Sequence, residues 1–248
     1  MNNLSSTQNP ITFCAQYIAE NPLLLPLEEL KLVAQKNEVL SDIEKTTLKE
    51  AHLFALCKSS ETDPNQEEIL YICECFGANG EGDIFKRLLS DPQLIEIIER
   101  AKENWPQGIF SILMLPFSHE PYLLPAEGIA DEDLEKDPLI RKKIEKIQRL
   151  QVPLRRKNDM LEAALIGYFQ PIYNQEYPKK FSSSLGKLLE KFAQANISAI
   201  LIEFSTEQLE IKFFSSTQTA EKQVLLPFDI SSKLKRNAFI SLNSEPNA

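Results

Sequence analysis

Apolar positions in the first hundred residues recur at spacings of three and four, which is the period of an amphipathic helix. One such stripe after Asp63 consists of Ile69, Ile72, Cys73 and Phe76. The dipeptide Asp-Pro at 63–64 and 91–92 is typical of a helix start, because aspartate accepts from the first unpaired amides and proline lacks an amide. We therefore expect a helical region over 10–108, after a disordered tail over 1–9.

The pattern changes after Gly108. The apolar run 109–115, IFSILML, ends at Pro116 and has the length of a buried strand. Further on, the helical period returns over 138–169 and 183–195, the latter with the stripe Leu185, Leu188, Leu189 and Phe192.

Short apolar segments near the C-terminus predict strands between about 198 and 242. We expect SAILIEF and LEIKFF to form a hairpin through the four residues 205–208, and QVLLPF and NAFISL to add two more strands. The expected fold class is α+β: a helical N-terminal half, then an antiparallel sheet of about four or five strands covered by helices. Residues 109–243 would form this α+β region, and 244–248 a tail.

Composition narrows the classes of function. The chain has 7 glycines among 248 residues and a net charge of −9. Few glycines disfavour phosphate-binding loops, and a negative charge disfavours non-specific binding to nucleic acid. The longest uncharged run is too short to span a bilayer and the N-terminus lacks a basic, apolar leader, so we expect no transmembrane segment and a cytoplasmic location.

Cysteines at 73 and 75 raise the question of a metal site. On the predicted helix their side chains would lie about 200° apart and could not converge on one ion. We expect Cys14, Cys57, Cys73 and Cys75 to be reduced thiols, with no metal and no cofactor.

The loop 116–128 contains Ser118-His119-Glu120 and holds the candidate proton-transfer groups His119, Glu120, Tyr122 and Glu127. Adjacent residues of an extended segment point in opposite directions, so Ser118 and His119 are poorly placed for a catalytic pair. The second histidine, His52, is predicted on the polar side of a helix. A turn or rim position is the simpler interpretation of His119.

Charge is unevenly distributed. Between Lys136 and Lys157 there are nine basic and two acidic residues, although the chain as a whole is acidic. On the predicted helix, Ile140, Ile144 and Ile147 form the apolar stripe and Lys142, Lys146 and Arg149 lie opposite. The predicted partner-binding residues are Lys142, Lys146, Arg149, Arg155, Arg156 and Lys157. The alternatives are i, i+4 pairing through Glu145 and neutralisation by the acidic residues 131–135.

These observations favour a non-enzymatic cytoplasmic interaction protein, an adaptor, chaperone-like or regulatory factor, that binds another protein. Nucleic acid is disfavoured because no aromatic residue lies among these basic residues. The alternatives are an enzyme with a site in the loop 116–128, and a phosphate- or lipid-binding surface, with peripheral membrane contact, through the basic helix 141–157. An outer strand could also accept a strand from a partner.

Overall fold

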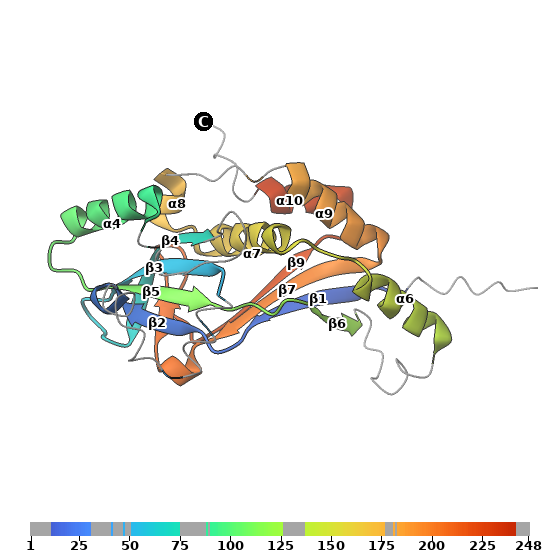
Figure 1. Ribbon diagram of the computed structural model, residues 1–248, viewed down its shortest axis with the longest axis horizontal. Coiled ribbons are helices and arrows are strands. Elements are labelled where there is room, and N and C mark those ends of the chain that lie inside the picture. Colours follow the sequence, from blue (N-terminus) through green and yellow to red (C-terminus); the bar gives the residue numbers. More distant parts are fainter. Residues whose placement is uncertain are drawn as a thin grey trace, which may run out of the picture.

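The computed structural model describes residues 11–30, 41, 47, 51–74, 88, 90–125, 137–176, 181 and 183–241. The described chain is α+β and contains two mixed sheets (Figure 1). Among the described residues, no helix is long and apolar enough to cross a membrane.

Sheet A has the strand order β6–β1–β7–β9. Its strands are β1 (Phe13–Ala19), β6 (Tyr122–Pro125), β7 (Ile197–Ser205) and β9 (Gln223–Asp229). β1 pairs in parallel with β7 and antiparallel with β6, and β7 pairs antiparallel with β9.

Sheet B has the order β2–β5–β3–β4–β8. Its strands are β2 (Leu23–Pro26), β3 (Leu53–Ser59), β4 (Gln66–Glu74), β5 (Phe110–Leu115) and β8 (Lys212–Phe214). The pairs are antiparallel except for β4 with β8, which is parallel. β8 follows β7 in the chain yet joins the other sheet, and β9 then returns to sheet A.

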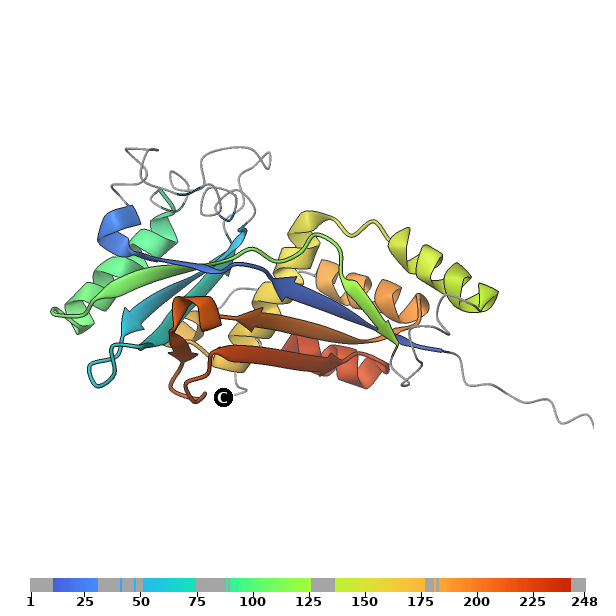
Figure 2. The same ribbon diagram turned by 90° about the horizontal axis from the view of Figure 1, so that it is seen from below.

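Helices cover the two sheets differently. They are α4 (Pro92–Asn104), α6 (Pro138–Gln148), α7 (Leu154–Phe169), α8 (Ile172–Glu176), α9 (Ser183–Gln194), η1 (Glu207–Leu209) and α10 (Lys233–Ser241). Sheet B is buried on both faces, because one face belongs to a core shared with sheet A and the other packs against α4 and Tyr173 of α8. α7, α9 and α10 lie on one side of sheet A, and the view from the opposite side shows its strands in front of them (Figure 2).

The expected helical N-terminal half is wrong, because this part of the chain is rich in strands. Residues 13–19 form β1, in which Phe13, Ala15, Tyr17 and Ala19 are buried and the residues between them are half-buried. This is the period of two of a strand with one covered face. The spacing of Cys14, Tyr17 and Ile18 fits a helix by coincidence, and the pairing with β7 decides the outcome.

Residues 53–59 and 66–74 are the hairpin β3–β4 rather than helices. Both faces of this hairpin are buried, so the sequence shows an apolar run without a clear period of two. Asp63-Pro64 forms the turn between the strands. Asp63 Oδ1 accepts from the Asn65 amide at 2.9 Å, and its carbonyl accepts from the Gln66 amide at 3.1 Å.

Two C-terminal expectations are also corrected. The strands expected to form a hairpin through 205–208 belong to different sheets. Fully buried Thr206 donates from Oγ1 to the Ile211 carbonyl at 2.7 Å and turns the chain toward sheet B. Residues 237–242 were expected as a strand, but 237–241 lie in α10, where Phe239 packs edge-on against Phe228.

The cap of α4 gives a first testable prediction. The Asp91 carboxylate accepts from the amides of Gln93 at 2.9 Å and Leu94 at 3.0 Å. We expect Asp91→Ala to lower the free energy of unfolding by about 1 kcal/mol, because both amides lose their acceptor. Urea denaturation measures this, and Gln93→Ala, at an exposed position on the same turn, serves as the control. An unchanged midpoint for Asp91→Ala would contradict the assigned cap.

Candidate functional site

Figure 2 shows sheet A from the side opposite α7, α9 and α10. Cys14 pairs with Leu124 and Ala199, and Gln16 pairs with Tyr122 and Leu201, so these side chains share one face. We call this surface the open face. Its side chains are Cys14, Gln16, Ile18, Tyr122, Leu124, Ala199, Leu201, Glu203, Ser205, Gln223, Leu225, Pro227 and Asp229.

Most of these side chains are apolar, which is unusual for the solvated face of a sheet. Tyr122, Leu124 and Leu225 are 51%, 40% and 55% exposed, and Ile18 and Leu201 are half-buried beside them. Exposed apolar side chains gathered on one face of a sheet often mark an interaction site.

The ionisable groups on and beside the open face are mainly acidic. Glu203 accepts from Gln16 Nε2 at 2.6 Å and from Gln223 Nε2 at 3.4 Å, and Glu20 accepts from the Tyr122 hydroxyl at 3.4 Å. Asp229 pairs with Lys235, and hydrogen bonds from Lys235 and Ser231 lower the pKa of Asp229 to about 2. Burial, with a smaller effect of Asp229, raises the pKa of Cys14.

The sheet edges are less suited to binding than the open face. β6 is short and ends with Pro125, β9 contains Pro227, and β2 ends with Pro26. Proline has no amide to donate and short edges offer few groups, so both features oppose the addition of a strand. The arrangement therefore favours docking onto the open face.

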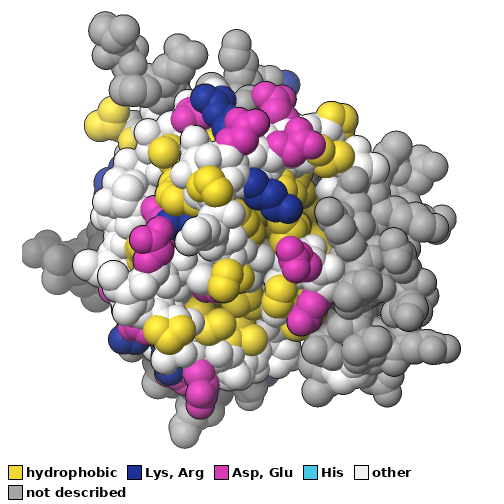
Figure 3. Space-filling model, turned by 90° about the vertical axis from the view of Figure 1, so that its left-hand side faces the viewer, with side chains coloured by type: hydrophobic (Ala, Val, Ile, Leu, Met, Phe, Trp, Pro, Cys, Tyr) yellow, Lys and Arg dark blue, Asp and Glu magenta, His cyan; other side chains and the backbone are white. Residues whose placement is uncertain are grey.

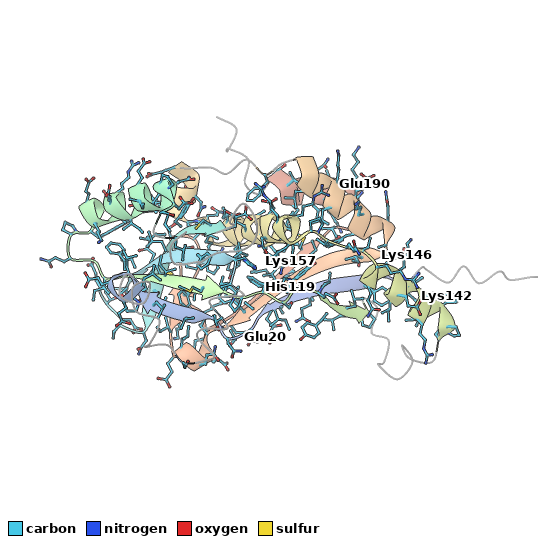
Figure 4. The ribbon with its side chains drawn as sticks, in the orientation of Figure 1. Glu20, His119, Lys142, Lys146, Lys157 and Glu190 are labelled. Atoms are coloured by element: carbon cyan, nitrogen blue, oxygen red, sulfur yellow. The ribbon has the colours of Figure 1, made fainter. Side chains whose placement is uncertain are left out.

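The predicted basic residues of α6 lie at the surface. Lys142, Lys146 and Arg149 are exposed, and Figure 4 shows Lys142 and Lys146 along α6, apart from Glu190 of α9. Lys146 Nζ donates to the Gln194 carbonyl at 3.3 Å, and Arg149 forms an exposed ion pair with Glu145 at 3.4 Å. The acidic residues 131–135 lie outside the described residues.

The remaining predicted basic residues, 155–157, differ in how far their side chains are exposed. Arg155 is exposed and Arg156 is half-buried, whereas Lys157 is only 2% exposed. Lys157 Nζ donates to the carbonyls of Phe117 at 3.3 Å and Ser118 at 2.9 Å (Figure 4). Burial lowers the pKa of Lys157 to about 8. Lys157 holds the connection between β5 and β6 and is not part of the basic surface.

The loop 116–128 does not form a catalytic arrangement among its described residues. His119 and Glu120 are exposed, Tyr122 lies on the open face, and Glu127 falls outside the described residues. Ser118 Oγ is buried without a hydrogen-bond partner. The nearby cavity, lined by His52, Leu53, Leu115, Phe117, Lys157 and Asn158, has no room for a water molecule and cannot admit a substrate. The segment preceding His52 contains Thr47 in a helix, whereas β3 begins at Leu53.

Carboxylates, rather than cysteines, form the described group with metal-binding potential. Oxygens of Glu74 at the end of β4 and of Asp159 and Glu162 on α7 all lie within 4.8 Å of one another. Oxygen ligands of this kind suit calcium or magnesium. Cys73 lies in strand β4, so the argument from opposite sides of a helix is wrong, and Cys75 lies outside the described residues. Burial raises the pKa of the Cys57 thiol, which makes this thiol unreactive.

The open face was missed by the sequence analysis. A signal was present in residues 223–229, where Gln223, Leu225, Pro227 and Asp229 are exposed and alternate with more buried residues. Two exposed apolar positions in such a strand indicate a surface that is not simply solvated. Tyr122 and Leu124 repeat this spacing in β6.

Comparison of the chain with protein-family models, with curated proteins and with solved structures finds no match.

Proposed function

We propose that this protein is a non-enzymatic interaction protein, and that another protein docks on the open face of sheet A. The observation that carries the proposal is the apolar character of this face, with Tyr122 and Leu225 both more than half exposed. Docking would remove these side chains and their neighbours Ile18 and Leu201 from water, which is the main source of favourable free energy in such association.

The charges of the open face indicate the chemistry of the partner. Glu203 lies among the apolar side chains and Glu20 lies at the end of β1. One cation beside this face, Lys235, is already paired with Asp229. A partner segment that presents apolar side chains together with lysine or arginine would complement this surface, because basic groups can approach the two glutamates.

A second candidate surface is formed by the basic residues of α6, its C-cap and the first turn of α7, with Lys142, Lys146, Arg149, Arg155 and Arg156 as the proposed contacts. It would select an acidic protein partner or an anionic lipid surface. The open face is favoured over α6 because exposed charges cost little when left in water, whereas exposed apolar area gains from being covered. A cytoplasmic location remains part of the proposal, and the free thiols of Cys14 and Cys57 support it.

Site-specific photocross-linking in cells tests the proposal. A benzophenone amino acid is placed at Tyr122 or Leu225 on the open face, at Lys142 on α6, and at Glu190 on the exposed side of α9 as the control. We expect one common protein to cross-link from positions 122 and 225 and not from position 190. The cross-linked peptide of the partner should be apolar and carry at least one lysine or arginine.

A second pair of variants tests whether the face itself binds. Leu225→Glu should reduce the cross-link from position 122 at least about tenfold, since a charge would be buried in the contact. Leu234→Glu is the matched control, because Leu234 is 79% exposed on α10 away from this face. Cross-links from position 142 alone would show that the partner binds α6 and not the open face. Absence of cross-links from all positions would overturn the proposed function. A product of twice the monomer mass would identify a second copy instead of a different partner.

A further inference from the structure

A pocket of about 640 Å³ lies at the end of sheet B, remote in sequence from the open-face strands. Two segments line it: residues 58–61, which include the end of β3, and residues 104–109, which connect α4 to β5. Figure 3 looks onto this end of the molecule and shows hydrophobic side chains gathered around a basic side chain, with acidic side chains nearby. The volume is in the range of sites for small organic molecules.

Trp105, the single tryptophan of the chain, is held rigidly in the wall of this pocket. Its ring meets fully buried Tyr173 edge-on, with 6.5 Å between the ring centroids. The turn behind it is closed by a hydrogen bond from the Gly108 amide to the Trp105 carbonyl at 2.9 Å. A Cβ at position 108 would lie 3.0 Å from Phe110 Cζ and 3.1 Å from Trp105 Cβ, so a side chain there would require one of these residues to shift.

Lys58 supplies a positive charge beside the indole. It is only 8% exposed although it lines the pocket, and its Nζ lies 4.7 Å from the centroid of the Trp105 ring. Its ion pair with Glu68 has a separation of 3.4 Å, which is longer than a strong charge-assisted hydrogen bond. An ammonium has three donors, so Lys58 retains capacity for an anionic oxygen in the pocket.

The segment that carries Trp105 also contributes apolar, solvent-exposed side chains to the lining. Ile109 is 66% exposed, and Pro106 beside it is exposed as well. Glu61 and Gln107 are exposed members of the lining. The pocket thus combines one buried cation, one aromatic face and an uncovered aliphatic wall.

We propose that this pocket binds a small organic monocarboxylate with an apolar body. The carboxylate would accept from Lys58 Nζ, and the apolar body would pack between Trp105 and Ile109. A cationic ligand is opposed by Lys58. A polyphosphate would need several donors and a flexible glycine-containing loop, whereas the described lining offers one lysine and a single glycine used for the turn. This inference is independent of docking on the open face.

Titration with naphthoate and with uncharged naphthamide tests the site, with binding measured by calorimetry and by the fluorescence of Trp105. We expect naphthoate to change the Trp105 emission and to bind at least about tenfold more tightly than naphthamide. Lys58→Met keeps the aliphatic stem and should remove this preference, whereas Lys142→Met on α6 should leave it unchanged. Equal affinities of the wild type for the two compounds, or a naphthoate affinity unaffected by Lys58→Met, would overturn the proposal.

A second variant tests the site independently, in case Lys58→Met does not fold. Ile109→Glu changes an exposed position and should preserve the thermal transition while lowering naphthoate affinity about tenfold or more, since it places a carboxylate in the apolar wall. Naphthoate binding that persists unchanged in Ile109→Glu would place the ligand elsewhere, such as the open face, and would also overturn the proposal.

Discussion

Replacing Asn174 with alanine is expected to lower the free energy of unfolding by about 2–4 kcal/mol, because two buried backbone groups lose their partners. Asn174 is 6% exposed in α8, and its amide pairs with Ile72 as a neighbouring strand would. Oδ1 accepts from the Ile72 amide at 2.8 Å, and Nδ2 donates to the Ile72 carbonyl at 2.8 Å. β8 pairs with β4 only over Gln66–Glu68, so Asn174 completes the strand edge beyond that point.

Asn174→Asp separates the hydrogen bonds from simple packing. At neutral pH the carboxylate can accept from the Ile72 amide but cannot donate to its carbonyl, so we expect a destabilisation of similar size. Stability relative to the wild type should partly recover on acidification, because the protonated acid can donate again. Urea denaturation measures both variants. Gln175→Ala at the neighbouring exposed position is the control, with an expected effect within about 0.5 kcal/mol. Near-neutral effects of both Asn174 variants would contradict the pairing.

The second large effect concerns pH and Lys157. In the folded state its pKa is about 8, whereas an unperturbed lysine titrates near 10.5. Between these values the unfolded chain holds a proton that the folded chain has released, so stability increases as the pH rises through this window. Below pH 8 the buried charge costs about 3 kcal/mol, and this penalty disappears above pH 10.5.

Comparison with Lys157→Met isolates this effect, since the other titrating groups are common to both proteins. Methionine removes the charge but also the hydrogen bonds to the carbonyls of Phe117 and Ser118. By pH 10.5 the wild type should have gained about 3 kcal/mol over the variant. Denaturation at a series of pH values measures the difference, and exposed Lys142→Met should show no such trend. A difference independent of pH would mean that Lys157 is not desolvated.

The three Asp-Pro dipeptides show how far local sequence could predict the fold. Asp91 caps α4 as expected, and Asp137 caps α6 in the same way, each side chain accepting from amides of the first turn. Asp63 makes the same kind of hydrogen bond in a strand-to-strand turn. Local chemistry predicts that an aspartate will bind free amides. Whether a helix or a strand follows depends on packing, and β4 is placed between β3 and β8.

The candidate sites likewise include residues whose exposure local spacing predicts and residues whose burial depends on tertiary contacts. Sequence spacing correctly placed Lys142, Lys146 and Arg149 on the exposed side of a helix with Ile140 and Ile147 buried. It could not show that Lys157 is buried, because this depends on the carbonyls of residues 117 and 118.

The open face and the pocket could not be predicted from the sequence, because each brings together residues from segments that meet only in the folded protein. Strands β1, β6, β7 and β9 are far apart in the sequence, so the shared exposure of their side chains becomes visible only after they pair. The pocket likewise depends on Lys58 and Trp105, which meet because β3 and β5 are neighbours.

The parallel pairing of β1 with β7 has a consequence for synthesis on the ribosome. β1 emerges before β7, its central neighbour in sheet A, which is complete only when residues 197–205 have been released. At about 5–20 residues per second, this interval lasts on the order of ten to forty seconds. During that time Phe13, Tyr17 and their neighbours have no permanent cover. The nascent chain is therefore expected to be most prone to aggregation through β1, and to gain its stable fold only after β7 has been released.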